Sequence, residues 1–347
     1  MSIEALLSTC LSSSAIARLH ARAEMPTVTD SPVAGHVSRA EIAQALTMIL
    51  FHDLVERVPT AQAYLEDVAR RGQRVVFDHG AVRTVLWPSG HLPPGERAIT
   101  RVLGPLGYAT REVYPLPLLN MTGRSWCHAD APESIAQFFV SELHPERFSR
   151  RFEDTVTRVI ATSRDPLSLA DLDDLAVLAA HRSLSLERAR RLLPALVKCF
   201  DRQHDLFALS DYDALRAESP EMAWIATEGN AFNHATDRVA NVEAVAEEQK
   251  RLGRPIKDTV EISRSGRVRQ TAFEAVQVER LFLDSGRQVR RVVPGSFYEF
   301  ISRDPLPSPS EGAPALDLAF DAGNATGIFA MTAGHTSAPK VADVFTT

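Results

Sequence analysis

The sequence predicts an α+β protein in which two modules, each with the element order β, α, β, β, β, form one cupped sheet around a metal site. The stretch FDHGAVRTV at 77–85 has the composition of a buried strand and places a histidine four residues before an arginine. The stretch FNHATDRV at 232–239 repeats this spacing. The elements that follow the two stretches also come in the same order, so we expect the same unit twice.

Residues 1–72 are expected to form a helical segment ahead of the first module. Apolar residues recur at helical spacing in 2–25 and in 39–71. Ser38 stands directly before the second run, where a serine commonly caps a helix. The first strand should therefore follow two or more N-terminal helices.

The first module is expected at 73–143. Its first strand, 75–86, is rich in valine, and alternation puts His79, Ala81 and Arg83 on one face. The stretch ERAITRVLGPLGY then predicts a helix after two prolines, and REVYPL, TGRSWCH and QFFVSEL predict three short strands.

The second module is expected at 211–303. An extended pattern is expected over 222–239, and the helix NVEAVAEEQKRLG at 241–253 ends on a glycine, as a C-cap should. The stretches DTVEIS and RVRQTAFEAV flank a turn at 264–266 and predict a hairpin, and SFYEFISR at 296–303 predicts the closing strand.

Two further segments lie outside the modules. Residues 144–210 carry three apolar stripes with polar opposite faces and predict a central helical insertion. Residues 304–347 begin with a run rich in proline and serine and are expected to form a surface loop and a tail that lines the pocket.

The composition argues against several classes of function. A formal net charge of −6 and a pI near 6.0 give no basic surface for nucleic acid. Three widely spaced cysteines, Cys10, Cys127 and Cys199, fit a reducing compartment and exclude a cysteine-rich metal site. No signal peptide or membrane span is indicated. We therefore expect a cytoplasmic protein.

A metal site is predicted from the strand positions of three residues. His79 and His234 lie on the equivalent first strand of each module and would converge across the cup. Glu299 lies in an apolar strand, where a buried carboxylate needs a partner. Two imidazoles and one carboxylate leave three positions open, which suits non-haem Fe(II) and oxygen chemistry. Alternatively, Glu299 faces solvent or pairs with Arg303.

The stretches HGAVR, NHATDR, SRSGRVRQTA and GSFYEFISR resemble, in this order, the DUF1338 family of 2-oxoadipate dioxygenase/decarboxylases, a branch of the vicinal oxygen chelate superfamily. The resemblance covers residues 40–335. It implies Fe(2+) held by His79, His234 and Glu299, with Arg83 as the catalytic residue that binds the substrate carboxylate. The implied partners are a 2-oxo acid and O2, and the implied products in lysine degradation are 2-hydroxyglutarate and CO2.

The resemblance also implies further substrate contacts. Gln270 in the second hairpin would hydrogen-bond the substrate, although a strand glutamine is often only solvated. Asn324 and Thr326 in DAGNATGIF would line the pocket, although this stretch also fits a plain turn. Arg238 mirrors Arg83 and has Asp237 or Glu228 as alternative ion-pair partners.

Two other functions compete with the dioxygenase. The first is a glyoxalase-like lyase or isomerase that uses Zn or Ni with four protein ligands, the fourth being Glu142 in QFFVSEL. The second is a non-catalytic metal-binding module. It is favoured if His79 and His234 lie more than about 6 Å apart, since ligands of one metal cannot be so separated.

Overall fold

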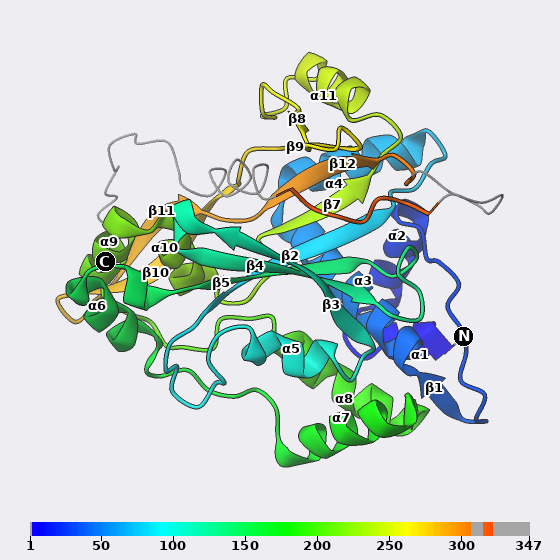
Figure 1. Cartoon of the computed structure of the whole chain (residues 1–347), viewed down its shortest axis with the longest axis horizontal. Helices are drawn as coiled ribbons and strands as arrows, with labels where there is room; N and C mark the ends of the chain where they lie inside the picture. Colours follow the sequence, from blue (N-terminus) through cyan, green and yellow to red (C-terminus); the bar gives the residue numbers. More distant parts are fainter. Residues whose placement is uncertain (1, 307–314, 322–347) are drawn as a thin grey trace, which may run out of the picture.

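The computed structural model describes residues 2–306 and 315–321, and a curled eight-stranded sheet lies at its centre (Figure 1). The strand order is β3-β4-β5-β2-β7-β12-β9-β8. The strands of this sheet are β2 Phe77–Val85, β3 Tyr108–Leu116, β4 Met121–His128, β5 Gln137–Leu143, β7 His234–Arg238, β8 Glu261–Ile262, β9 Val268–Ala272 and β12 Phe297–Arg303.

The sheet consists of two halves with the same internal order. In the first half β2 pairs in parallel with β5, and β4 and β3 follow; in the second β7 pairs in parallel with β12, and β9 and β8 follow. The helices α5 Arg97–Leu103 and α11 Val242–Arg251 follow the first strands. The two first strands, β2 and β7, pair antiparallel at the centre. The predicted α+β fold with two βαβββ modules is confirmed.

A hairpin interrupts the second module between β9 and β12. Its strands, β10 Gln277–Asp284 and β11 Arg287–Pro294, form a separate two-stranded antiparallel sheet. This hairpin was not predicted from the sequence. It packs on the helices α9 Leu209–Glu218 and α10 Pro220–Glu228 through Phe282 and Val293.

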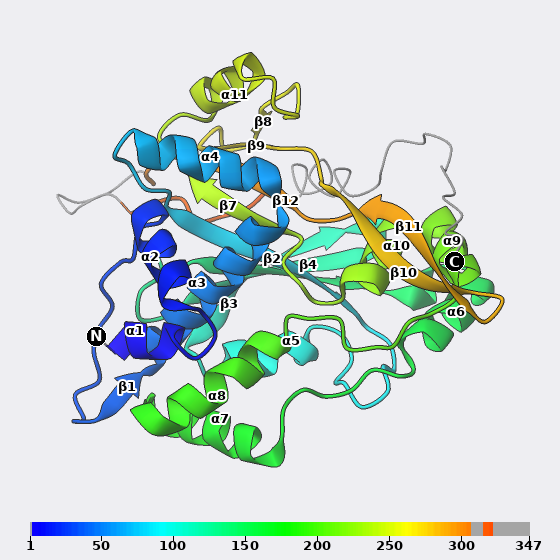
Figure 2. The same ribbon diagram turned by 180° about the vertical axis from the view of Figure 1, so that it is seen from behind.

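The N-terminal helices cover one face of the sheet (Figure 2). They are α1 Ser2–Leu7, α2 Ser13–Arg22, α3 Arg39–Arg57 and α4 Pro59–Arg70. Ser38 caps α3 as predicted, and it forms a reciprocal capping box with Glu41. The central helix α3 is buried along most of its length, so it belongs to the main hydrophobic core.

The helical insertion follows β5. It contains the 3₁₀ turn Pro145–Arg147, the helices α6 Arg150–Ile160, α7 Leu169–His181 and α8 Leu186–Lys198, and the short strand β6 Ser183–Ser185. Outside the insertion, two further short elements are β1 His36–Ser38 and the 3₁₀ turn Pro117–Leu119. Strand β6 pairs with β1 and so ties the insertion to the N-terminal region. None of the helices in the described part of the chain is both long and apolar enough to cross a bilayer.

The expectation of an extended chain from 222 onward is wrong up to residue 228. These residues belong to α10, which Ser219 caps and Pro220 begins. All residues from Glu221 to Glu228 are buried, so the helix has no apolar stripe beside a polar face and its period is hidden in the sequence. Extended chain begins only at β7.

The two faces of β2 serve different purposes. Phe77 and Val82 pack into the core with the N-terminal helices. Gly80 shares this face, and a Cβ there would lie 2.3 Å from the ring of Phe232, so only glycine allows the close approach. The opposite, concave face carries His79 and Arg83.

Candidate metal centre

Three neighbouring strands bring the predicted ligands together. His79 comes from β2, His234 opens β7 and Glu299 lies in the middle of β12. All three side chains are buried, and their potential ligand atoms lie within 4.8 Å of one another. The strand register explains this: His79 and Glu299 both align with Thr236 of β7, and His234 is two residues away on the same face.

The distances fit a single metal ion. Nε2 of His79 lies 3.3 Å and Nε2 of His234 lies 3.4 Å from the same oxygen, Oε2 of Glu299. Two ligands about 2.1 Å from one metal, at right angles or slightly more, are about 3.0–3.4 Å apart. The imidazole rings have centroids 5.5 Å apart. The separation beyond about 6 Å that would favour a non-catalytic module is therefore not found.

Burial and mutual attraction set the protonation of the three groups. Burial lowers the pKa of His234 to about 3, against the attraction of Glu299. Burial also opposes the charge of Glu299, but His234 and His79 outweigh it and lower the pKa of this carboxyl. Burial likewise opposes a charge on His79, but hydrogen bonds to Asp78 and Glu299 outweigh it and raise the pKa of that imidazole. An ionised Glu299 and a neutral His234 are the forms that bind metals.

The outer nitrogens of both histidines have partners, so the inner nitrogens face Glu299. Nδ1 of His79 donates to Oδ1 of Asp78 at 2.9 Å. Nδ1 of His234 lies 3.3 Å from the side-chain amide of Asn233. Thr236 Oγ1 donates to Glu299 Oε2 at 2.5 Å. Such outer contacts fix the orientation of metal ligands.

Arg83 lies on the same face of β2 as His79 and is fully buried. Its guanidinium is 5.0 Å from the ring centroid of Trp224, and its charge helps to lower the pKa of His234. Burial lowers the pKa of Arg83 to about 10, so it remains charged near neutral pH. Although an arginine on a strand is often exposed to solvent, Arg83 is not.

A small cavity adjoins the three ligands. It has a volume of about 30 Å³, and besides the ligands it is lined by Ala81, Phe139, Ser141, Asn233, Gln270, Phe320 and Asp321. Gln270 is buried and not solvated. Phe320 belongs to residues 315–321, which we call the C-terminal strap (red in Figure 1). The predicted residues Asn324 and Thr326 lie outside the described residues.

Comparison with known proteins identifies the family. Residues 38–311 match the family model described as 2-oxoadipate dioxygenase/decarboxylase. The chain belongs to this family. No curated protein matches this member of the 2-oxoadipate dioxygenase/decarboxylase family.

Solved structures share the fold of this family member. A glyoxalase superfamily protein from Ralstonia eutropha JMP134 is 53% identical with a TM-score of 0.87, and the match covers 92% of this chain and 98% of that one. Hydroxyglutarate synthase from Oryza sativa, solved with 2-oxoadipate, is 20% identical with a TM-score of 0.67 and coverages of 90% and 97%. The Pseudomonas putida enzyme, also solved with 2-oxoadipate, is 19% identical with a TM-score of 0.63 and coverages of 86% and 74%.

The alternative ligand Glu142 is not at the metal centre of this family member. Phe139 and Ser141 of β5 line the cavity, so strand alternation turns Glu142 to the opposite face. There its Oε2 accepts a hydrogen bond from the backbone of Glu96 at 2.8 Å, and its Oε1 lies 3.6 Å from Arg124. The chain at Gly95 passes so close that a Cβ would lie 2.1 Å from this carboxylate. Glu142 thus supports the start of α5.

Replacing Glu142 with glutamine is expected to leave metal affinity unchanged within about twofold while lowering thermal stability. The variant gives the part-buried backbone N–H of Glu96 a neutral acceptor in place of a charged one, and a hydrogen bond to a charged group contributes about 1.5–3 kcal/mol. Titration calorimetry with Co²⁺ and a thermal melt would measure the two effects. A large loss of metal affinity at unchanged stability would return Glu142 to the ligand set.

Asp78 lies beside the predicted ligand His79, although no role was predicted for it, and Arg303 contacts it. One alternative paired Arg303 with Glu299, and this alternative is wrong. Nη2 of the Arg303 guanidinium lies 2.8 Å from Oδ1 of Asp78. Nε of Arg238 lies 3.6 Å from Oδ2 of the same carboxylate, instead of pairing with Glu228. The sequence contains a pattern that could have drawn attention to Arg303. Glu299, like both histidines, is followed four residues later by an arginine.

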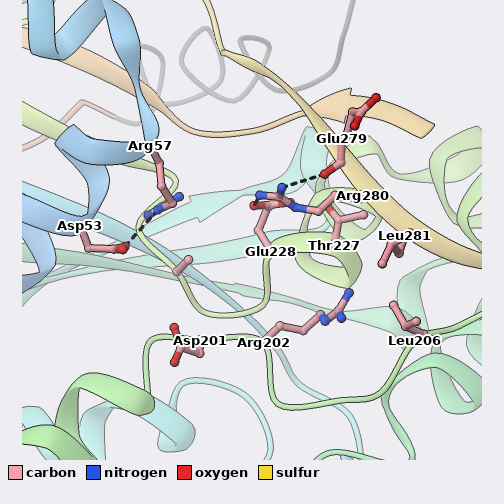
Figure 3. A pocket seen from close by; sticks show the side chains of 11 residues that line it. Asp53, Arg57, Asp201, Arg202, Leu206, Thr227, Glu228, Glu279, Arg280 and Leu281 are labelled. Carbon is pink, nitrogen blue, oxygen red and sulfur yellow. Dashed lines mark hydrogen bonds and ion pairs between the residues drawn. The ribbon is translucent and has the colours of Figure 1, made fainter. Parts of the chain in front are cut away.

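A larger cavity of about 420 Å³ lies elsewhere, between α3, α10 and β10, and shares no lining residue with the metal centre (Figure 3). It is rich in charge, and four of its charged lining residues form two ion pairs. Arg280 forms a two-pronged ion pair with Glu228, and Nε of Arg57 lies 3.0 Å from Asp53. The smaller cavity, and not this one, adjoins the three predicted metal ligands.

Proposed function

We propose that this protein is an Fe(2+)-dependent dioxygenase that converts 2-oxoadipate and O2 into 2-hydroxyglutarate and CO2. Family membership supports the reaction class. The observation that carries the proposal is the buried set of His79, His234 and Glu299, whose spacing suits one face of a metal ion and leaves the other face for substrate and O2.

The proposed reaction balances without an external reductant. The 2-oxo acid loses its first carboxyl as CO2, one oxygen atom enters the new carboxylate and the other enters the hydroxyl group of the product. Fe(2+) would supply the redox chemistry that lets O2 react with an organic acid. His79, His234 and Glu299 would hold it, and the 2-oxo acid end of the substrate would bind beside it in the cavity.

Arg83 is proposed to bind the far carboxylate of the substrate. Its planar guanidinium offers two parallel N–H groups, the geometry that a carboxylate accepts. It follows His79 by four residues on one strand face, so its distance from the metal is fixed by the strand. A rigid spacing of this kind measures the length of a dicarboxylic acid.

The other cavity residues would orient and enclose the substrate. Gln270 faces the cavity, and its side chain makes one long contact within residues 2–306 and 315–321, 3.4 Å from Nε2 to Oε2 of Glu261. Its amide is therefore suited to a substrate hydrogen bond. Phe320 closes the cavity with an apolar ring, which would exclude water from the reacting atoms. The present volume of about 30 Å³ suits about one water molecule, so the substrate requires the lining to move.

The expected result for the purified protein, loaded anaerobically with Fe(2+), is consumption of O2 and release of CO2 in equal amounts when 2-oxoadipate is added. An oxygen electrode and labelled CO2 would measure both, and protein loaded with Zn²⁺ is the control. Absence of turnover with Fe(2+), together with tight Zn²⁺ or Ni²⁺ binding and isomerisation of a thiol adduct, would instead support the glyoxalase-like function.

A further inference from the structure

Asp78 owes its position to an irregularity in β2. Across β7, Phe77 aligns with Asp237 and His79 aligns with Thr236, so Asp78 is the extra residue of a bulge. In a regular strand, neighbouring side chains point to opposite faces. Here the bulge lets the side chains of Asp78 and His79 lie side by side, 2.9 Å apart between Oδ1 and Nδ1.

This contact determines how His79 is presented to a metal. When Nδ1 donates its proton to a carboxylate, Nε2 carries the lone pair, and the ring plane is fixed. Nε2 of His79 then faces Oε2 of Glu299 at 3.3 Å. The side chains of Asp78 and His79 are only 1% and 3% exposed, so water does not compete for the bond.

Arg303 joins Asp78 to the C-terminal strap. Its Nε lies 3.0 Å from Oδ2 and its Nη2 lies 2.8 Å from Oδ1 of Asp78. Its remaining nitrogen, Nη1, donates to the backbone carbonyls of Asp317 and Ala319, both at 2.8 Å. One fully buried guanidinium therefore bonds the carboxylate that orients His79 and the backbone of the strap.

The strap in turn contacts His79 directly. The ring of Phe320 meets that imidazole edge to face, with centroids 4.8 Å apart, and lies 5.1 Å from the guanidinium carbon of Arg303. The backbone N–H of Phe320 donates to the hydroxyl of Tyr114 at 3.0 Å. The strap, Arg303, Asp78 and His79 thus form a closed ring of contacts.

We propose that Asp78 is the positioning residue for His79 and that Arg303 makes this positioning depend on the docked strap. The proposal rests on the proposed role of His79 as a metal ligand but not on the identity of the substrate. Closure over the cavity and orientation of the ligand are then one event, because the same guanidinium stabilises both.

The first test is metal binding by Asp78→Asn in the full chain. The amide keeps the size of the side chain but loses the charge that Arg303 and His79 share. Affinity for Co²⁺, measured by calorimetry without substrate, should fall about 10–100-fold, and the visible spectrum of bound Co²⁺ should change. The matched control is Asp174→Asn, which removes a buried carboxylate paired with Arg188 and Arg191.

The control should lose stability and keep both the Co²⁺ affinity and the spectrum. If Asp78→Asn binds Co²⁺ with the affinity and spectrum of the unaltered protein, Asp78 is not a positioning residue. Co²⁺ binding is measured without turnover. Unchanged binding in Asp78→Asn would therefore not contradict the proposed reaction, and absence of turnover with 2-oxoadipate would not change how the Co²⁺ result is interpreted.

The second test examines the link to the strap. Hydrogen exchange of a peptide covering 315–321 should be faster in Asp78→Asn than in the unaltered protein and unchanged in Asp174→Asn. Arg303→Gln alone and Arg303→Gln combined with Asp78→Asn should lose Co²⁺ affinity by a similar factor. The reason is that the effects of two residues that act as one unit do not add. Two results would overturn the coupling through Arg303. One is unchanged hydrogen exchange of the strap in Asp78→Asn, and the other is a loss of Co²⁺ affinity in the double variant equal to the product of the two single losses.

Discussion

Replacing His79 with alanine is expected to abolish tight metal binding and, with it, the consumption of O2. The variant removes one of the three proposed ligands and leaves Glu299 with a single imidazole neighbour. Contacts outside the ligand set typically change metal affinity 10–100-fold, so loss of a ligand should exceed about a hundredfold. Calorimetry with Fe(2+) or Co²⁺ under anaerobic conditions measures this directly.

His204→Asn is the matched control for this prediction. His204 is also buried, and its Nε2 lies 2.8 Å from the carbonyl oxygen of Ala226, away from the metal ligands. Its replacement should lower the melting temperature and leave metal affinity unchanged. Metal bound with full affinity by His79→Ala would exclude His79 from the ligand set and remove the basis of the proposed function.

Replacing Arg83 with methionine is expected to keep metal binding and to impair the reaction of dicarboxylic substrates selectively. Methionine fills much of the buried volume beside Trp224 but offers no N–H group. Two charge-assisted hydrogen bonds to the far carboxylate contribute about 1.5–3 kcal/mol each. The kcat/KM for 2-oxoadipate should therefore fall about 100-fold or more.

The comparison substrate is 2-oxohexanoate, which presents the same 2-oxo acid but ends in a methyl group. Its kcat/KM should change little in Arg83→Met, and Arg83→Lys should lie between the two proteins because it keeps the charge without the planar fork. Equal losses for both substrates would show that Arg83 supports the fold or the metal and does not read the second carboxylate.

The sequence predicted the centre of the sheet well because its signals are local. His79, His234 and Glu299 lie in apolar strands, and the repeated order of elements places these strands next to one another. Helix α10 was missed because burial on every side removes helical periodicity, although Ser219 and Pro220 mark its start. The hairpin of β10 and β11 was missed although its turn contains Gly286.

Other features of the site depend on pairing between distant strands and are absent from any single stretch. The bulge at Asp78 exists only relative to β7, and its partner Arg303 comes from β12, 225 residues later. The misplaced ligand, Glu142, shows the same limit. A shift of one residue along a strand reverses the face, and both faces of β5 carry apolar residues, Phe139 and Leu143 on one and Phe138 and Val140 on the other.

Because β2 and β7 pair antiparallel, the two ends of the row formed by His79, His234 and Glu299 differ. Arg83, four residues after His79, lies toward Trp224. Arg238 and Arg303, four residues after His234 and Glu299, lie in the opposite direction, because β7 and β12 run antiparallel to β2. Repetition of one pattern therefore sends cations to both ends of the ligand row. The arginines at one end face the carboxylate of Asp78, and Arg83 at the other faces an indole. Under the proposed role of Arg83, a linear dianion would lie with its far carboxylate at the Trp224 end, because the arginines at the other end already pair with Asp78.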